Sequence, residues 1–441
     1  MDDWRERYRD KVITPEQAAA RIESGQVVAV GFNISAPRCF LGALGRRTDE
    51  LHGVTLYQHL ALSPAPWYED GYAGGVQVRS GYLSAFSRPA VEWGVVDVDV
   101  MTVWTATKPE HGAGRARDHM YPDVAVVSIS PPDADGLVSF GSQVWYHKRW
   151  VERAKIAIGE VNVNYIRTGG DNSLSVDAFD LLIEQPETLP LASFARDAGG
   201  GDASTADTIG RLVAGLVQDG DCIQIGFGQI SEAVVGALTD KNDLGFHAEI
   251  MPAGAIPLIQ AGNLTGARKA IDRDRHVATG LLLRSEDYAY VDGNPAFALR
   301  EAHYTNNPSV IAQIDNFVAI NAALAVDLTG QVSAEAFGPQ MYSGVAGQLD
   351  FQIGAMLSPG GRGITVLPAT ARGGQASRIV AQFPEGQVIS VPRTFADFVV
   401  TEFGVASLQG LTQRGRAAAL IEVAHPSARE ELRSAARRLF G

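Results

Sequence analysis

The residues around Glu249 are the strongest candidates for covalent chemistry. The triplet His247-Ala248-Glu249 is flanked by apolar residues on both sides, from Leu244 to Phe246 and from Ile250 to Ile256. Desolvation in such a segment makes a carboxylate a nucleophile or a base. A metal site needs three or four ligands, and no other histidine cluster supplies them. We therefore expect Glu249 to react without a metal; the alternative is a solvated charge or a salt bridge.

Three glycine-containing segments are suited to hold a negative oxygen. The segment Gly226-Phe227-Gly228-Gln229-Ile230-Ser231 follows an apolar run, and bare backbone before a helix attracts anions. Its last residue is not glycine, so the pattern is weak as a dinucleotide fingerprint. Gly344 and Gly347 lie in a second segment, and Arg372 and Arg378 lie in a third that suits a phosphate. The alternatives are ordinary strand-to-helix turns and a solvated basic loop.

Several common motifs do not occur in the sequence. It has no GxxxxGK[ST], HExxH, GxSxG or CxxC pattern. Asp133-Ala134-Asp135-Gly136 resembles the start of a calcium loop, but its counterpart 194 residues later, Asp327-Leu328-Thr329-Gly330, lacks the acidic pattern. We expect both segments to be turns between strands.

The elements that must position these residues occur twice. Residues 14–44 predict a helix that begins at Thr14, a strand over 27–31, a loop and a second helix. Residues 204–238 repeat this order, with Ser204 and Asp207 resembling a capping box. Gly25 and Gly31 recur 195 positions later as Gly220 and Gly226. The sequence therefore predicts two copies of one domain, and the alternative is a chance likeness of two βα units.

The apolar runs of both copies do not alternate strictly between apolar and polar residues, which is typical of strands covered on both faces. We predict two tandem open α/β domains of related topology, over residues 1–185 and 204–441, joined by a Gly- and Pro-containing linker. From about Pro426 the pattern predicts an amphipathic helix.

The composition limits the class of function. The 441 residues are 46% hydrophobic and 20% charged, and 37 basic against 50 acidic side chains give a net charge of −13. Such a charge argues against nucleic-acid binding, although one local positive pocket suffices for an anionic ligand. Two cysteines, a charged N-terminus and the lack of a long apolar run favour a cytoplasmic protein without a membrane segment.

A series of short motifs runs in order along nearly the whole chain. They are Pro131-Pro132-Asp133, Gly136-x-Val138-Ser139, Glu160-Val161-Asn162-x-Asn164, His247-x-Glu249 with Met251, Asn306-Asn307-Pro308, Asn321, Asp327-Leu328-x-Gly330-Gln331-Val332, Ser343-Gly344-Val345-x-Gly347-Gln348-x-Asp350-Phe351, Val399-Val400-Thr401-Glu402-x-Gly404 and Ala424-His425-Pro426. In this order the chain resembles the acetyl-CoA hydrolase/transferase family, within it the branch of 4-hydroxybutyrate and butyrate CoA-transferases.

The resemblance implies an active site between the two domains and a role for each matching residue. Glu249 would be the nucleophile, and Asn321 would orient the reacting groups. Backbone N–H groups around Ile230 and Gly347 would form the oxyanion hole. The remaining residues that we expect in the oxyanion and CoA-binding region are Gly228, Gly344, Ala346, Arg372 and Arg378, and those in the substrate pocket are Asn33, Arg38 and Met251.

The sequence departs from the family pattern at two places. Ala346 stands where relatives carry glycine, which could narrow the acyl pocket. Gly169-Gly170-Asp171 stands where relatives carry His-Gly-Asp, so any role of that histidine is missing. Arg38 could pair with a second carboxylate of a dicarboxylic substrate, and the alternative is a surface arginine.

The expected activity is transfer of CoA between a short-chain acyl-CoA and a free carboxylic acid, by ping-pong chemistry through a glutamyl-CoA thioester. Coenzyme A would be a co-substrate, with no tightly bound cofactor and no metal, and a homo-oligomer (dimer or tetramer) is expected by analogy. Three alternatives stay open: a thioester hydrolase on the same site, a nucleotide-dependent dehydrogenase using the Gly226 loop, and a non-catalytic acyl-CoA-binding relative.

Overall fold

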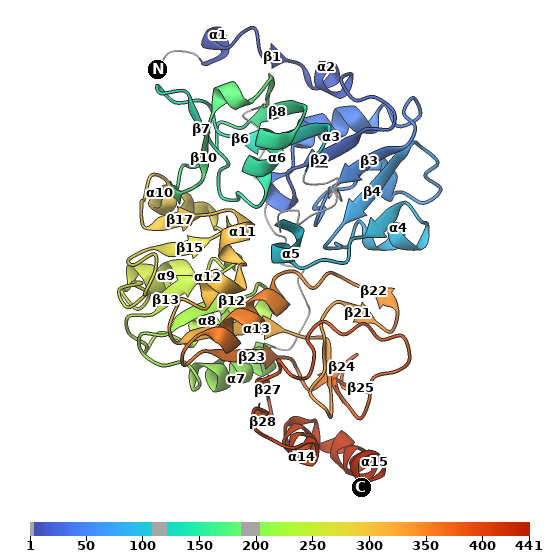
Figure 1. The fold of residues 1–441 in the computed structure, drawn as a ribbon, viewed down its shortest axis with the longest axis vertical. Helices are drawn as coiled ribbons and strands as arrows, with labels where there is room; N and C mark the ends of the chain where they lie inside the picture. Colours follow the sequence, from blue (N-terminus) through green and yellow to red (C-terminus); the bar gives the residue numbers. More distant parts are fainter. Residues whose placement is uncertain (1–3, 108–120, 187–202) are drawn as a thin grey trace. The chain divides into compact units, whose positions relative to one another are not determined.

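The structure, a computed structural model, describes residues 4–107, 121–186 and 203–441. The chain divides into two compact units (Figure 1). Unit 1 comprises Met1–Met101, Thr105–Phe194 and Tyr288–His303; unit 2 comprises Thr102–Trp104, Ala195–Asp287 and Tyr304–Gly441. The predicted domains, 1–185 and 204–441, differ from these units in two exchanged segments: residues 102–104 belong to unit 2, and residues 288–303 belong to unit 1.

Unit 1 is built on a parallel sheet. Its strand order is β1 (Val12–Ile13), β11 (Leu181–Glu184), β8 (Ile156–Val161), β6 (Val124–Ile129), β2 (Val27–Val30), β3 (Val54–Tyr57), β4 (Val76–Ser80) and β5 (Val96–Val98). Every residue of β6 is buried, as expected for a strand covered on both faces. The unit's helices include α1 (Trp4–Arg7), α2 (Pro15–Ala19), α3 (Arg38–Gly45), α4 (Arg88–Glu92), α6 (His147–Arg153) and α10 (Tyr288–Val291).

The sheet of unit 2 repeats this topology. Its strands run in the order β28 (Gly404–Ser407), β27 (Phe398–Thr401), β23 (Arg362–Val366), β18 (Phe317–Ala322), β12 (Cys222–Ile225), β13 (Gly245–His247) and β15 (His276–Ala278). The order from β27 to β15 matches the order from β11 to β4 in unit 1, strand for strand. Only the edge strand β28 is antiparallel to its neighbour among these seven. The predicted duplication and the α/β class are therefore confirmed.

Helices and short ladders complete unit 2. The helices include α7 (Ala203–Ala214), α8 (Gln229–Gly236), α9 (Ala255–Gln260), α12 (Pro308–Ile311), α13 (Gln348–Leu357), α14 (Gln413–Val423) and α15 (Arg429–Phe440). The ladders are β14 (Ile250–Met251) with β16 (Gly280–Leu281), β19 (Ala325–Asp327) with β20 (Val332–Ser333) and β26 (Ile379–Val380), β21 (Ala336–Phe337) with β22 (Gln340–Met341), and β24 (Thr370–Ala371) with β25 (Ala376–Ser377). Unit 1 has two further ladders, β7 (Leu137–Ser139) with β10 (Ser173–Ser175), and β17 (Phe297–Leu299) with β9 (Gly169–Gly170).

The helix caps and turns predicted from the sequence were confirmed in part. The Thr14 hydroxyl accepts the Gln17 N–H in a capping box at the start of α2, as its position predicts. The capping box expected at Ser204 is wrong, because α7 already begins at Ala203. The turns at Asp133 and Asp327 are confirmed. Each carboxylate accepts the N–H groups two and four residues later, at 2.8–3.1 Å.

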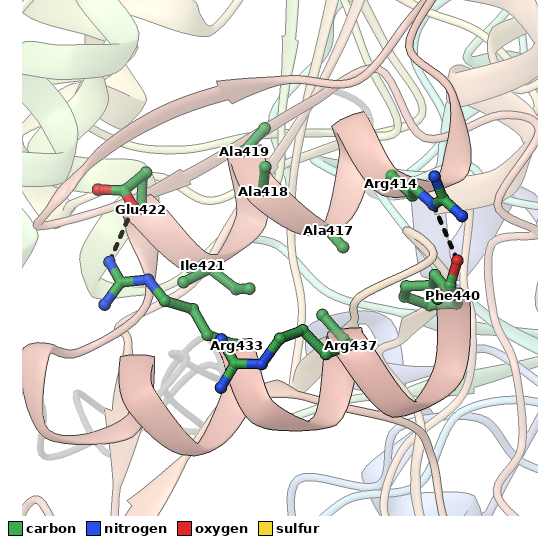
Figure 2. A pocket seen from close by; sticks show the side chains of 11 residues that line it. Arg414, Ala417, Ala418, Ala419, Ile421, Glu422, Arg433, Arg437 and Phe440 are labelled. Atoms are coloured by element: carbon green, nitrogen blue, oxygen red, sulfur yellow. Dashed lines mark hydrogen bonds and ion pairs between the residues drawn. The ribbon is translucent and has the colours of Figure 1, made fainter.

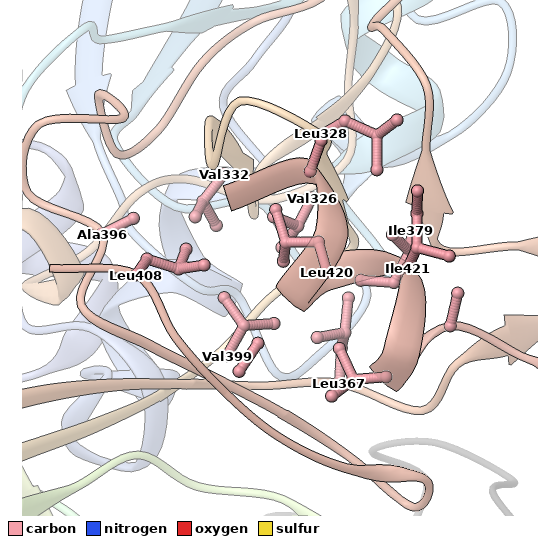
Figure 3. Close-up of a cluster of buried hydrophobic side chains, with 14 of the residues drawn as sticks. Val326, Leu328, Val332, Leu367, Ile379, Ala396, Val399, Leu408, Leu420 and Ile421 are labelled. Carbon is pink, nitrogen blue, oxygen red and sulfur yellow. The ribbon is translucent and has the colours of Figure 1, made fainter. Parts of the chain in front are cut away.

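The C-terminal part of unit 2 packs on its own apolar core. Figure 3 shows Leu420 and Ile421 of α14 against side chains such as Val326, Leu367 and Val399, all buried. The predicted amphipathic helix is confirmed as α15. A pocket of ≈ 590 Å³ between α14 and α15 is crossed by an Arg433–Glu422 ion pair at 3.1 Å (Figure 2). This pocket contains none of the predicted site residues.

Candidate active site

Glu249 lies at the carboxyl end of a parallel strand. It follows β13, with Ala248 between, and directly precedes β14. Its backbone carbonyl accepts the N–H groups of Thr279 and Gly280, both at 3.0 Å. These bonds fix the backbone at the edge of the sheet where ligands bind in open α/β folds. Of its apolar neighbours, Phe246, Ile250 and Met251 are buried strand residues, whereas Ala255 and Ile256 are buried in α9.

Two donors hold the Glu249 carboxylate. The Asn306 side-chain N–H donates to Oε2 at 2.9 Å, and the Gly347 backbone N–H is a second donor to the carboxylate. Burial raises the pKa of Glu249 to about 7, although both donors lower it. The side chain keeps partial exposure, so it is accessible as well as desolvated. A carboxylate in this state is both basic and oriented.

Gly347 is glycine because of its two neighbours in this site. A Cβ at this position would overlap the Asn306 amide nitrogen and Glu249 Oε2, and would lie 3.0 Å from the Phe351 ring. Gly347 is also the residue before helix α13. The backbone therefore approaches the carboxylate at a distance that no side chain permits.

The predicted anion loop around Gly228 lies at the start of a helix. Gly228 has φ +113° and directly precedes α8. Ile230 is the second residue of that helix, where backbone N–H groups have no intrahelical acceptor. The helix dipole adds a positive field at the same end. The role of Ile230 in an oxyanion hole stays a prediction.

Ala346 occupies a conformation that favours glycine. Its φ is +47°, in the left-handed region. Its carbonyl accepts the Val103 N–H at 3.2 Å, which ties this loop to the segment Thr102–Trp104 of the same unit. The departure from the family pattern is thus a strained backbone position next to Gly347.

Asn321 makes its hydrogen bonds within the sheet. Its side-chain amide pairs reciprocally with that of Gln224 from β12, at 3.0 and 3.1 Å. The amide that contacts Glu249 is that of Asn306, not Asn321. The orienting role expected of Asn321 therefore stays a prediction without a contact to support it.

The remaining predicted residues are spread over both units. Arg378 directs its guanidinium to the carbonyls of Ala323, Leu324 and Thr370, at 3.3–3.4 Å, so its charge stabilises a loop. Arg372 is exposed between β24 and β25. Met251 and Gly344 are buried in unit 2; Asn33, buried with φ +51°, and Arg38, partly exposed, belong to unit 1. Their roles in binding stay predictions.

Two residues of this site lacked an assigned role in the sequence. Asn306 and Asp350 each lay within a quoted motif, but residue type alone did not relate them to Glu249, 57 and 101 positions earlier. Within the described ranges, no group of three or more metal-ligating side chains gathers, and no helix is long and apolar enough to cross a membrane.

The chain is similar to known proteins over nearly its whole length. The N-terminal domain of the acetyl-CoA hydrolase/transferase family matches residues 1–192, and its C-terminal domain matches residues 285–436. A succinyl-CoA:cyclohexane-1-carboxylate CoA transferase of Geobacter metallireducens is 37% identical over 99% of this chain and 97% of its own. A 4-hydroxybutyrate coenzyme A transferase of Clostridium kluyveri is 34% identical over 99% of this chain and 100% of its own.

The likeness extends to solved structures. The crystal structure of RipA from Yersinia pestis superposes with a TM-score of 0.90, at 32% identity and over 99% of each chain. The chain therefore belongs to the acetyl-CoA hydrolase/transferase family, and the resemblance drawn from its motifs is confirmed.

Proposed function

We propose that this protein transfers CoA from an acyl-CoA to a free carboxylic acid, with Glu249 as the group that carries CoA between them. The observation that carries the proposal is the desolvated Glu249 carboxylate held by Asn306 and Gly347. The relatives described above, which match the chain from end to end, are named CoA transferases. The coenzyme is a co-substrate that enters and leaves with the acyl group.

In the first half-reaction a free Glu249 oxygen attacks the thioester carbonyl. The tetrahedral intermediate expels CoA thiolate and leaves an acyl–glutamyl anhydride. The thiolate then attacks the glutamyl carbonyl of this anhydride, which releases the first carboxylate and leaves CoA on Glu249 as a thioester. No proton is consumed in this sequence, since carboxylate and thiolate both react as anions.

In the second half-reaction the acceptor carboxylate attacks the glutamyl thioester and expels CoA thiolate. The thiolate attacks the acyl carbonyl of the new anhydride, so the new acyl-CoA leaves and the Glu249 carboxylate is restored. A glutamate suits both half-reactions. Its carboxylate oxygens are nucleophiles, and its carboxyl carbon, once acylated or bound to CoA, is attacked by a nucleophile.

The surroundings of Glu249 support this chemistry. Asn306 donates to Oε2 and so fixes the direction in which the carboxylate faces. The Gly347 N–H and the N-terminal N–H groups of α8 around Ile230 are suitable donors to the tetrahedral oxyanion. Each such donor typically contributes about 3 kcal/mol to lowering the barrier. We propose that Gly228, Gly344 and Ala346 belong to the same oxyanion and CoA-binding region.

Substrate binding is assigned to side chains other than the donors to Glu249. We propose Arg372, which is exposed, for the CoA phosphates, together with Arg378, whose guanidinium also binds carbonyl groups. Asn33, Arg38 and Met251 are proposed for the acyl pocket. A cytoplasmic location remains a prediction from the sequence, and a homo-oligomer remains a prediction by analogy.

A thioester hydrolase on the same site is the second function. Water would then attack the glutamyl thioester or the anhydride in place of the acceptor acid. The partial exposure of Glu249 leaves room for water, whereas the relatives named above are transferases. Release of CoA that does not depend on added carboxylate would favour the hydrolase.

The test is a trapping experiment with purified protein. Acyl-CoA alone is added, followed by borohydride or hydroxylamine, and the peptides are analysed by mass. We expect modification at Glu249 and ping-pong kinetics with a set of donor and acceptor acids. Glu249→Gln should lose both, whereas Glu385→Gln, at an exposed glutamate, should lose neither. Modification elsewhere, or an unmodified Glu249 peptide in inactivated protein, would contradict the proposal.

A further inference from the structure

Asp350 is a buried carboxyl group beside the proposed nucleophile. It is the third residue of helix α13 and only 2% exposed. A carboxylate near a helix N-terminus is favourable, but full burial is costly unless hydrogen bonds compensate it. Its hydrogen-bond partners therefore indicate why the chain keeps a carboxyl group there.

Both oxygens of Asp350 bind the segment Thr102–Trp104. Oδ1 accepts the Thr102 hydroxyl at 2.5 Å, and Oδ2 accepts the Trp104 backbone N–H at 2.9 Å. Between these two anchors the Val103 N–H donates to the Ala346 carbonyl at 3.2 Å. A segment nearly 250 residues away in sequence is thereby fixed against the loop that presents Gly347.

The same carboxyl group contacts the nucleophile through Asn306. The Asn306 side chain interacts with Asp350 and donates to Glu249 Oε2 at 2.9 Å. Its amide oxygen accepts the Thr305 hydroxyl at 2.9 Å, which fixes the orientation of the amide. The Asn306 side chain thus interacts with both carboxyl groups.

We propose that Asp350 is a positioning residue for CoA transfer, which aligns Glu249 through Asn306 and holds the Ala346–Gly347 loop through the segment Thr102–Trp104. This inference rests on the proposed function. It extends that function, since it assigns to Asp350 the alignment of Glu249 through Asn306.

Burial raises the pKa of Asp350 to about 8, and the charge of Glu249 raises it further, against hydrogen bonds from Thr102, Trp104 and Asn306. Near neutral pH the carboxyl group is therefore largely protonated. Asparagine has the shape of a protonated aspartate. Its oxygen can accept the Trp104 N–H while its nitrogen donates to the Thr102 hydroxyl. Alanine can do neither.

Steady-state transfer kinetics of the full-length protein test the inference. Asp350→Ala should lower kcat at least about 100-fold and change KM for acyl-CoA less than about 3-fold, since misplacement of the nucleophile affects turnover more than binding. Asp350→Asn should stay within about 10-fold of wild type in kcat. Thr102→Val, which removes one anchor, should lower kcat about 10-fold at unchanged KM.

The matched control is Asp397→Asn. Asp397 is a partly buried aspartate that accepts a backbone N–H, that of Gly363, at 3.2 Å. It precedes β27, at the amino end of the parallel strands, whereas Glu249 follows the carboxyl end of β13. The kcat of Asp397→Asn should therefore stay within about 3-fold of wild type.

Four results would overturn the inference: kcat of Asp350→Ala within 3-fold of wild type, a loss confined to KM, Asp350→Asn as damaged as Asp350→Ala while still folded, or a silent Thr102→Val. If Asp350→Ala does not fold, the Asn and Val variants decide.

Failure of the proposed function is recognised separately, as wild-type protein without transfer activity. In that case a double-mutant cycle of Asp350→Ala with Glu249→Ala, which removes both carboxyl groups, still tests by urea unfolding the connection between them. Additive effects on the free energy of unfolding would refute it.

Discussion

The state of the Glu249 carboxylate predicts that removing its charge makes the protein more stable. Its pKa is raised from 4.5 to about 7 by burial. A raised pKa means that the folded protein binds the proton more tightly than the unfolded chain. Stability is therefore lost as the pH rises from 4.5 towards 7, and the loss is complete above 7. Glu249→Gln cannot ionise and should not suffer this loss.

The magnitude follows from the two pKa values. Linkage gives a destabilisation by ionisable Glu249 of about 3 kcal/mol at pH 8 and about 1 kcal/mol at pH 5. Because the side chain is partly exposed, solvent reduces both figures, which are upper limits. The glutamine oxygen can still accept the N–H groups of Asn306 and Gly347, so its hydrogen bonding is largely preserved and changes little with pH.

The assay is urea unfolding of wild type and Glu249→Gln at pH 5, 6, 7 and 8, followed by circular dichroism. We expect the variant's advantage to grow with pH by up to about 2 kcal/mol, with an equal slope m. Glu385→Gln, at an exposed glutamate, should show no such growth. An advantage of Glu249→Gln that is constant or falls with pH would refute the argument that burial dominates this carboxylate.

Three further predictions concern neighbouring features. Gly347→Ala should lower kcat at least about 100-fold, because its Cβ overlaps the Asn306 amide and the nucleophile; wild-type kinetics would contradict the close approach. Ala346→Gly should raise the free energy of unfolding by about 1 kcal/mol, since φ +47° strains alanine; a loss in urea unfolding would show that the strain is absent. Burial raises the pKa of both Cys39 and Cys222 to about 12, so neither thiol should react with iodoacetamide at pH 8 until the protein unfolds.

The fold was largely predictable because its signals are local or repeated. Helix, strand and glycine loop recur at an offset of 195 residues, and the sheets of the two units share their strand order. The two turns at Asp133 and Asp327 are alike in detail, because Oδ1 of each aspartate accepts the backbone N–H four residues later. The exchanged segments 102–104 and 288–303 could not be found in this way, because they depend on contacts between distant parts of the chain.

The site was predictable only in part, for the same reason. An acidic residue in an apolar strand is visible in the sequence, and so is a glycine loop. Which amide contacts that carboxylate is decided by tertiary packing: Asn321 bonds to Gln224, and Asn306 bonds to Glu249. Both are asparagines in quoted motifs, and residue type did not distinguish them.

The duplication places different side chains at the ends of equivalent strands. Cys222 pairs with Gly245 as Val27 pairs with Thr55, and Cys222 lies 195 positions after Val27. Four residues past each of these partners stand Glu249 in unit 2 and His59 in unit 1.

His59 is buried, and its Nδ1 accepts the Gly81 N–H at 2.7 Å, so a ring nitrogen is used for structure. Glu249 instead receives its hydrogen bonds from Asn306 and Gly347 and keeps partial exposure. One topology thus provides the same strand end twice, and the side chain with its donors decides which copy reacts.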